Sequence, residues 1–197
     1  TALHDGNAES VWQASVAAHL FPPELGPQPA QRIANPDFAA PLDRGLLDWQ
    51  TCVSCGPWVA AEHDPAVLSA IPGDSAHPRR SALSLVFHGD QGDAAVLVHQ
   101  QLLLRPARAY RLRFASAAAN GDAKSGGVFV AVRSGNRDLV RVPAAMASGW
   151  KLQEQSLTTP ADTADVAIEV RYARPLGTVP LAATVWLSGF ALTPLPQ

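Results

Sequence analysis

Two cysteines three positions apart are the first residues here that could do chemistry. Cys52 and Cys55 are the only cysteines of the chain, and such a pair could be a redox dithiol, half of a zinc site or a small disulfide loop. A redox thiol needs a helix N-terminus or a cation nearby, but a Gly-Pro step follows and leads into a strand pattern. Zinc would need two further ligands, and neither His63 nor His77 stands in a repeated ligand spacing. Two plain thiols in a loop, or a Cys52–Cys55 disulfide in an exported domain, are the favoured interpretations.

Two polar clusters could suggest acid–base or metal chemistry. They are the Glu-His-Asp run at 62–64 and the His-Gly-Asp-Gln-Gly-Asp run at 88–93. Neither contains a nucleophile elbow, a His-Glu-x-x-His spacing or a carboxylate pair that a cleft could separate. Turn residues are commonly polar because they hydrogen-bond their own backbone. We therefore expect no enzymatic activity.

Aromatic and arginine side chains are the better candidates for binding. Trp58 follows Cys-Gly-Pro in a predicted loop, where its ring could stack on a sugar or pack in the core. Phe129 is out of phase with the valines on either side of it, so we expect it to point away from the core, as a platform or under a loop. Arg113 and Arg171 belong to the wet faces of two predicted strands. Their guanidinium groups suit carboxylate or sulfate groups of an acidic polysaccharide.

A simpler interpretation of the arginines is a solvated surface. Arg111 and Arg133 also alternate with apolar residues, and Glu169 lies on a similar strand. Arginines on such strands commonly pair with neighbouring acids, and these strands need not share one sheet. Both interpretations of the arginines remain open from the sequence.

Composition limits the classes of partner. The chain has 197 residues, enough for one main hydrophobic core, with 16% charged residues and a formal net charge of −2. No basic field exists to hold nucleic acid. No run of 18 apolar residues and no charged-then-apolar leader is present, so we expect no membrane insertion and interpret the sequence as a mature protein or an excised domain.

The chain divides into a short N-terminal segment and one larger domain. Residues 7–20 predict a helix, because Asn7 can cap it and an apolar stripe recurs every four residues. Prolines then end the helix, so residues 1–30 are expected to be a helix and a Pro-rich linker. This segment could dock on the domain or mark the junction with a helical partner domain.

Residues 31–197 change to a period of two, which is typical of strands with one buried face. Turn clusters lie between the strands, at 88–93, 120–127, 133–138 and 158–165. The predicted strands span 47–51, 58–62, 81–88, 95–104, 109–115, 127–133, 149–157, 165–173 and 184–193. No helix alternates with them. The expected fold is therefore all-β, an antiparallel β-sandwich of jelly-roll type with one short N-terminal helix.

Ordered landmarks along residues 31–194 resemble a known family. They are Asn35-Pro36-Asp37-Phe38, Trp49, Ser81-Ala82-Leu83, Gln100-Gln101, the run LLLRPARAYRLRF at 102–114, Trp150 and TVWLSGFALTP at 184–194. This series is similar to the galactose-binding-domain-like jelly rolls of the family 4, 9 and 22 carbohydrate-binding modules. The same layout occurs in domains appended to bacterial envelope and polysaccharide-related proteins.

The resemblance carries expectations about individual residues. It implies that Trp49, Trp150 and Trp186 are buried, as Trp12 should be on its helix stripe. Family members commonly hold a structural calcium with the acid after the opening Phe and with acids near the last strand. Ala39 and Ser188-Gly189 occupy those places here. Calcium prefers several carboxylate oxygens, so we expect no metal and no other cofactor, although Asp37 is retained.

These observations support one main hypothesis and one alternative. The first is a non-catalytic carbohydrate-binding-like module of an exported or envelope-associated bacterial polysaccharide system, in the periplasm or outside the cell. Its ligand would be a polysaccharide or oligosaccharide, and its candidate binding residues are Trp58, Phe129, Arg113 and Arg171. The alternative is a protein-interaction or assembly domain of the same fold, attached to a helical partner domain.

Overall fold

Ten antiparallel strands form the described part of the protein. The computed structural model describes Ala14, Ala18 and residues 33–43, 47–52, 58–62, 81–120, 127–162 and 165–196, without the side chains at 58, 61 and 62. The strands are β1 (Gln50–Thr51), β2 (Trp58–Glu62), β3 (Ala82–His88), β4 (Ala94–Leu102), β5 (Ala109–Ala119), β6 (Val128–Ser134), β7 (Arg137–Pro143), β8 (Lys151–Thr158), β9 (Val166–Ala173) and β10 (Ala182–Pro194).

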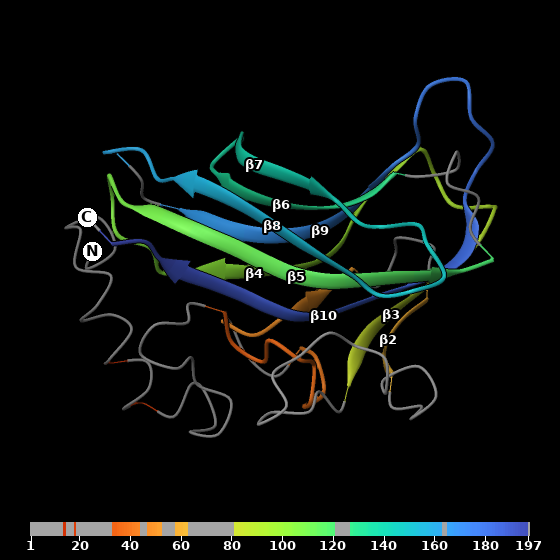
Figure 1. Ribbon diagram of the computed structural model, residues 1–197, viewed down its shortest axis with the longest axis horizontal. Helices are drawn as coiled ribbons and strands as arrows, with labels where there is room; N and C mark the ends of the chain where they lie inside the picture. The colour runs from red at the N-terminus through yellow and green to blue at the C-terminus, as the bar shows by residue number, and fades with distance from the viewer. Residues whose placement is uncertain are drawn as a thin grey trace.

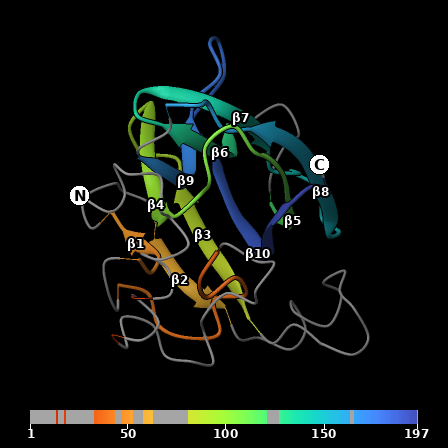
Figure 2. The same cartoon turned by 90° about the vertical axis from the view of Figure 1, so that its left-hand side faces the viewer.

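The strands build two stacked sheets of five (Figure 1). The first sheet has the order β1-β4-β9-β6-β7, and the second has the order β2-β3-β10-β5-β8. Figure 2 shows the two layers edge-on, with β1 beside β2 at one margin and β7 beside β8 at the other. This arrangement confirms the predicted all-β sandwich.

Alternating apolar residues fill the space between the sheets. In β9, Val166, Ile168, Val170 and Tyr172 are all buried, and the intervening residues are half-buried on the opposite side. The inward residues of β5 and β6 join the same core. Each large apolar side chain buried in this way contributes about 1.5–3 kcal/mol to stability. The period of two thus sets which side of each strand is left for function.

An aromatic cluster anchors the segment that precedes β1. Phe38, Trp49 and Phe190 pack together with ring centroids 5.2–5.7 Å apart, and Phe114 stacks on Phe190 at 5.3 Å. The backbone N–H of Phe190 donates to the carbonyl of Pro36 at 3.0 Å. The Asn-Pro-Asp-Phe landmark therefore joins the last strand to the start of the domain.

Two buried amides hold this same segment in place. The Asn35 side chain donates to the carbonyl of Ala40 and accepts from the Ala40 N–H, at 3.0 and 3.2 Å. The Gln100 side chain accepts from the N–H of Ala34 and donates to its carbonyl, at 3.0 and 3.1 Å. Both amides are 1% exposed, and paired buried amides avoid the cost of an unsatisfied polar group. These bonds give the opening landmark and the glutamine of β4 structural roles.

The structure adds one strand that the sequence pattern did not predict. The cluster at 133–138 was expected to be a turn, but only Gly135 and Asn136 connect β6 to β7. Gly135 has φ of +54°, a conformation that suits a two-residue hairpin. Polar residues on both sides of this hairpin made the turn look longer than it is.

The expected burial of the tryptophans holds for Trp49 but is wrong for Trp186. Trp49 is fully buried, whereas Trp186 is half-buried, between the core residues Val185 and Leu187. Its neighbours in β10 point inward, so Trp186 must lie on the outer side of the second sheet. Trp150 is also half-buried, ahead of β8.

The N-terminal predictions lie almost wholly outside the described residues. The exceptions are Ala14 and Ala18, joined by an N–H to carbonyl bond of 2.8 Å with the spacing of an α-helix. The helix over 7–20, the burial of Trp12 and the domain boundary at residue 30 stay predictions.

Candidate functional site

The outer face of the first sheet collects polar side chains in rows that cross its strands. One row crosses all five strands and consists of Gln50, His99, Glu169, Ala131 and Arg141. Residues directly opposite one another in antiparallel strands share a face and contact each other. Strands distant in the sequence therefore bring these groups side by side.

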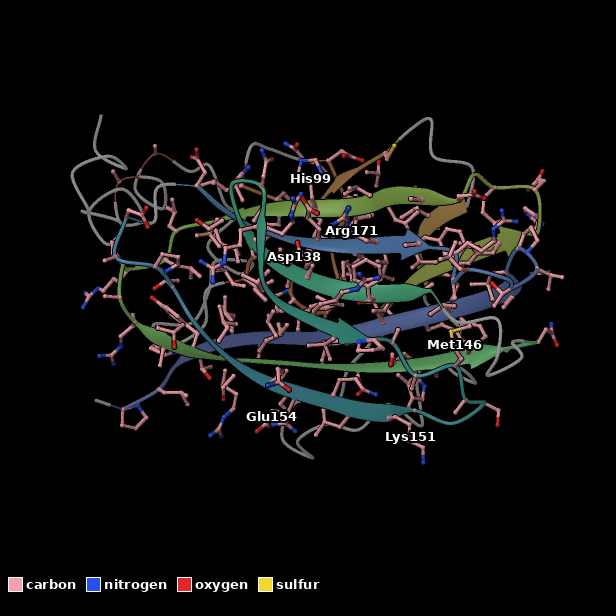
Figure 3. The ribbon with its side chains drawn as sticks, turned by 90° about the horizontal axis from the view of Figure 1, so that it is seen from above. His99, Asp138, Met146, Lys151, Glu154 and Arg171 are labelled. Atoms are coloured by element: carbon pink, nitrogen blue, oxygen red, sulfur yellow. The ribbon has the colours of Figure 1, made fainter. Side chains whose placement is uncertain are left out.

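Two parallel rows flank the central one. Val96, Arg171, Phe129 and Pro143 form the row on one side, and Gln101, Ala167, Arg133 and Asp138 form the row on the other. The labelled side chains of His99, Arg171 and Asp138 lie near one another over this sheet (Figure 3). We call the three rows together the polar face.

Phe129 lies in one of the two flanking rows of the polar face, and two guanidinium groups lie over its ring. It is 4% exposed, although it points away from the core as its phase predicted. The Arg141 Cζ atom lies 3.5 Å from the ring centroid, and the Arg171 Cζ atom lies 5.7 Å from it. Cation–π contacts of this kind contribute about 0.5–2 kcal/mol. Phe129 is therefore a support for arginines rather than an open stacking platform.

Arg133 and Arg171 share two carboxylates beside this ring. The Arg133 Nε atom lies 2.9 Å from an Asp138 oxygen, and its Nη1 atom lies 3.6 Å from a Glu169 oxygen. Arg171 reaches the same two acids, at 3.8 Å for Asp138 and 3.6 Å for Glu169. The expected pairing of these arginines with Glu169 and other acids is therefore observed.

The pairing is electrostatic more than it is hydrogen-bonded. Arg133 Nε and Glu169 Oε2 are both buried and lack a hydrogen-bond partner among the described groups. Arg133 Nε lies 2.9 Å from an Asp138 oxygen, which is close enough for a hydrogen bond. Its N–H does not point at that oxygen, so no hydrogen bond forms. Leaving such atoms unbonded costs about 1–3 kcal/mol each. The network thus retains unused donor and acceptor capacity.

Arg141 differs from the other two arginines of the polar face. It is exposed, and among the residues that the structure describes no carboxylate lies within 4.0 Å of its guanidinium group. Its Cζ atom lies 3.5 Å from the centroid of the Phe129 ring, so the ring covers one side of the guanidinium group. Three arginines and two carboxylates give this part of the face one excess positive charge.

The candidates predicted from the sequence do not form one site. Phe129 and Arg171 are cross-strand neighbours on the polar face. Arg113 lies on β5 of the second sheet, exposed and opposite Glu154, while Arg111 pairs with that same acid at 3.4 Å. Trp58 begins β2 at the edge of the second sheet, and its side chain is outside the described part.

Sequence reasoning did not select His99, Asp138 or Arg141 for the site. Asp138 and Arg141 belong to β7, the strand that was not predicted. Arg141 lies between Val140 and Val142, and this apolar–polar–apolar pattern is the sequence signal that could have predicted a strand with Arg141 on its outer side. His99 follows Val98 in β4, where a register shift between Val96 and Val98 breaks the simple alternation.

A second concave feature lies at the margin where β1 and β2 meet. It is a pocket of about 400 Å³ lined by Ala39, Pro41, Leu42, Asp43, Thr51, Val59 and Ala60. The two carboxylate oxygens of Asp43 accept from the N–H and the hydroxyl of Thr51, at 2.7 and 2.6 Å. Asp43 is therefore occupied by a structural role, and the rest of the lining is mainly apolar.

The residue next to this pocket, Cys52, is disulfide-bonded. Cys55 lies outside the described residues, so the Cys52–Cys55 pairing stays a prediction. The Cys52 N–H donates to the carbonyl of Leu97 at 3.0 Å, which ties this residue to β4.

The positions that hold calcium-binding acids in the resembled family have other environments here. Ala39 is exposed, and the hydroxyl of Ser188 donates to the carbonyl of Ser81 at 2.9 Å. Gly189 adopts φ of +67° at a register shift of β10. Within the described ranges, no three His, Cys, Asp or Glu side chains gather as a metal site would require, and no helix is long and apolar enough to cross a membrane.

Known structures share this fold at low sequence identity. A CBM4 structure aligns with a TM-score of 0.57 and 13% identity over 83% of this chain and 99% of that one. TmCBM61 in complex with β-1,4-galactotriose aligns with a TM-score of 0.53 and 17% identity, over 84% of this chain and 99% of that one. The chain therefore has the jelly-roll fold of carbohydrate-binding modules.

An enzyme shares the fold as well. The Stig cyclase Fisc from Fischerella sp. TAU aligns with a TM-score of 0.50 and 16% identity over 85% of this chain and 98% of that one. No protein-family model and no curated protein matches the sequence. The fold is thus shared by binding modules and a cyclase, so function must be argued from the site itself.

Proposed function

We propose that this protein is a non-catalytic carbohydrate-binding module whose polar face binds an oligosaccharide segment of a polysaccharide. The observation that carries the proposal is the row that crosses all five strands of the first sheet, with Gln50, His99 and Glu169 in register. Amide, imidazole and carboxylate groups can donate to or accept from sugar hydroxyls. The two modules with similar structures support a saccharide as the ligand, and one of them holds β-1,4-galactotriose.

The proposal gives His99 and Gln101 the main contacts with sugar hydroxyls. Gln101 is exposed and His99 is half-exposed, two positions apart on β4, so both side chains point to the same side of the strand. Because the strand fixes their spacing, little backbone freedom is lost on binding. Gln50 of β1 extends the same row toward the margin of the sheet.

A binding role without turnover is supported by the state of the two acids on the polar face. Hydrolysis of a glycosidic bond needs two carboxyl groups placed on either side of the scissile bond. Asp138 and Glu169 instead lie beside the same two arginines, at 2.9–3.8 Å. Their charge is already neutralised within the protein.

We further propose an exported or envelope-associated location in a bacterial polysaccharide system. The disulfide at Cys52 supports this location, because disulfides persist in oxidising compartments. The resemblance to domains of envelope proteins points the same way.

Calorimetric titration with neutral and acidic oligosaccharides tests the proposed function. The panel holds β-1,4-galactotriose, xylo-oligosaccharides, cello-oligosaccharides and oligogalacturonate. We expect saturable binding to at least one of them, weakened about tenfold in His99→Ala through loss of about 1.4 kcal/mol of contacts. The matched control is Gln155→Ala, an exposed polar position on β8 of the second sheet, which should bind like the wild type. Absence of binding across the panel by folded protein would contradict the proposal.

A second candidate function, docking of a partner protein domain, is favoured by one exposed loop. Leu176 and Val179 are 102% and 70% exposed in the segment between β9 and β10, which projects beyond the sheets (Figure 1). The Thr178 N–H and hydroxyl both donate to the carbonyl of Pro175, and Arg174 pairs with Asp93 at 2.6 Å. This loop is held in shape while its apolar side chains face solvent. Loss of a co-purifying partner in Leu176→Asp, with saccharide binding retained, would support this role.

A further inference from the structure

We infer that the saccharide bound by the polar face is acidic, and that Arg141 binds a carboxylate of a hexuronic acid unit. This inference rests on the proposed function, since it places the ligand on the same face. It goes further by naming the chemical class of the ligand and the residue that selects it.

The charge balance of the face is the first argument. Arg133 and Arg171 are matched by Asp138 and Glu169 at distances of 2.9–3.8 Å. Arg141 adds a third positive charge to the same cluster, and none of the described carboxylates lies within ion-pair distance of it. A single anionic group is therefore what would complete the cluster.

The placement of the Arg141 guanidinium is the second argument. Its Cζ atom lies 3.5 Å from the Phe129 ring centroid, so the ring occupies one flat side of the group. Stacking leaves the N–H donors at the edge of the guanidinium plane available, and a carboxylate matches two of them with parallel hydrogen bonds. A neutral hydroxyl has a single oxygen, so it cannot accept two parallel hydrogen bonds from the guanidinium edge as a carboxylate does.

Pre-organisation of the side chain is the third argument. A long arginine side chain gives up much of its rotamer freedom when it is fixed. The contact with Phe129, which is 4% exposed and fixed on β6, already restricts Arg141 before any ligand arrives. Arg171 lies over the same ring at 5.7 Å. Arg141 is thus held ready for an anion beside the row that binds the sugar hydroxyls.

A sulfate ester would offer similar anionic oxygens, and the experiment separates it from a carboxylate. Calorimetry compares four polymers: oligogalacturonate, the same oligomer with its carboxyl groups reduced to alcohols, a sulfated galactan and unmodified galactan. Each is titrated at low and at high salt into the wild type, Arg141→Gln and Lys151→Gln. Lys151 is exposed on β8 of the second sheet, so Lys151→Gln removes one positive charge away from the polar face.

We expect the wild type and Lys151→Gln to bind oligogalacturonate at least about tenfold more tightly than the carboxyl-reduced oligomer at low salt. A gain of this size corresponds to one charge-assisted hydrogen-bonded pair. Arg141→Gln should lose that preference and bind the acidic and the reduced oligomer with equal affinity. Arg141→Gln loses the contact with Phe129, so the variant should stay folded and melt only a few degrees below the wild type, and a thermal melt checks this.

Each other outcome overturns the inference in a distinguishable way. If the wild type binds the acidic and the reduced oligomer with equal affinity, the ligand is not selected for its acid group, and the proposed function still stands. A preference for oligogalacturonate that persists in Arg141→Gln places the anion elsewhere. A preference of the wild type for the sulfated galactan alone would show that the anionic group is a sulfate ester and not a carboxylate. Failure to bind any saccharide overturns both the inference and the proposed function.

Discussion

Glu169 shows how much of the polar face depends on single side chains. It lies between His99 and Ala131 in the sheet and reaches the guanidinium groups of Arg133 and Arg171. Its side chain is only 13% exposed. A charge in such a position is stabilised by its partners, and removing it leaves two arginines with one carboxylate between them.

We therefore expect Glu169→Gln to lower the free energy of unfolding by about 1–3 kcal/mol. The matched control is Glu154→Gln, whose ion pair with Arg111 at 3.4 Å is nearly half exposed on both sides. Exposed pairs contribute about 0–1 kcal/mol, so the control should change stability little. Urea unfolding of both variants gives the two free energies of unfolding. Equal losses in the two variants would show that the ion pairs of Glu169 contribute no more than an exposed pair.

Trp58 provides a second test at the scale of single residues. The sequence made it a candidate stacking residue, and its strand lies at the edge of the second sheet. If the polar face holds the ligand, Trp58→Ala should bind oligosaccharide within about twofold of the wild type, a difference of about 0.4 kcal/mol. A larger loss in calorimetry would move the site to the margin beside β1 and β2.

At the scale of elements, the turn at Asn35 joins the start of the domain to the aromatic cluster. Asn35 has φ of +44°, in the left-handed region that asparagine and glycine tolerate best. Its side chain makes two buried hydrogen bonds to Ala40. Conformation and hydrogen bonding thus both contribute to the choice of residue.

Two substitutions separate these contributions. Asn35→Gly keeps the conformation and should cost about 1–3 kcal/mol for the lost hydrogen bonds. Asn35→Ala should cost about 1 kcal/mol more, because alanine is strained at this φ. Thermal or urea unfolding of the pair gives the difference, and an alanine variant as stable as the glycine variant would rule out the conformational contribution.

Some strands could be predicted from the sequence and others could not. Alternation predicted β5, β6 and β9 and the outward position of Phe129, because a strand exchanges faces with every residue. It missed β7, since the polar residues around Gly135 obscured a two-residue hairpin. The polar face itself could not be predicted, because its rows depend on strand order and register. Arg113 and Arg171 look alike in the sequence and lie on different sheets.

At the scale of the whole molecule, the disulfide links structure to compartment. A Cys52–Cys55 bond closes a loop of four residues, and the chain-entropy model gives it about 2 kcal/mol. We expect the unfolded protein to react with no thiol reagent unless it is first reduced. The reduced protein should stay folded, with a lower free energy of unfolding. Mass spectrometry after alkylation counts the thiols, and two labelled cysteines before reduction would contradict the prediction.

The sandwich as a whole offers two broad outer surfaces, and the central claim is that saccharide binds to only one of them. Amide chemical-shift mapping by NMR, during titration with an oligosaccharide, tests this claim most directly. We predict shifts concentrated in β4, β9, β6 and β7, strongest around His99, Phe129 and Arg141. Shifts concentrated in β2, β3, β10, β5 and β8, or no shifts at saturating ligand, would contradict the account.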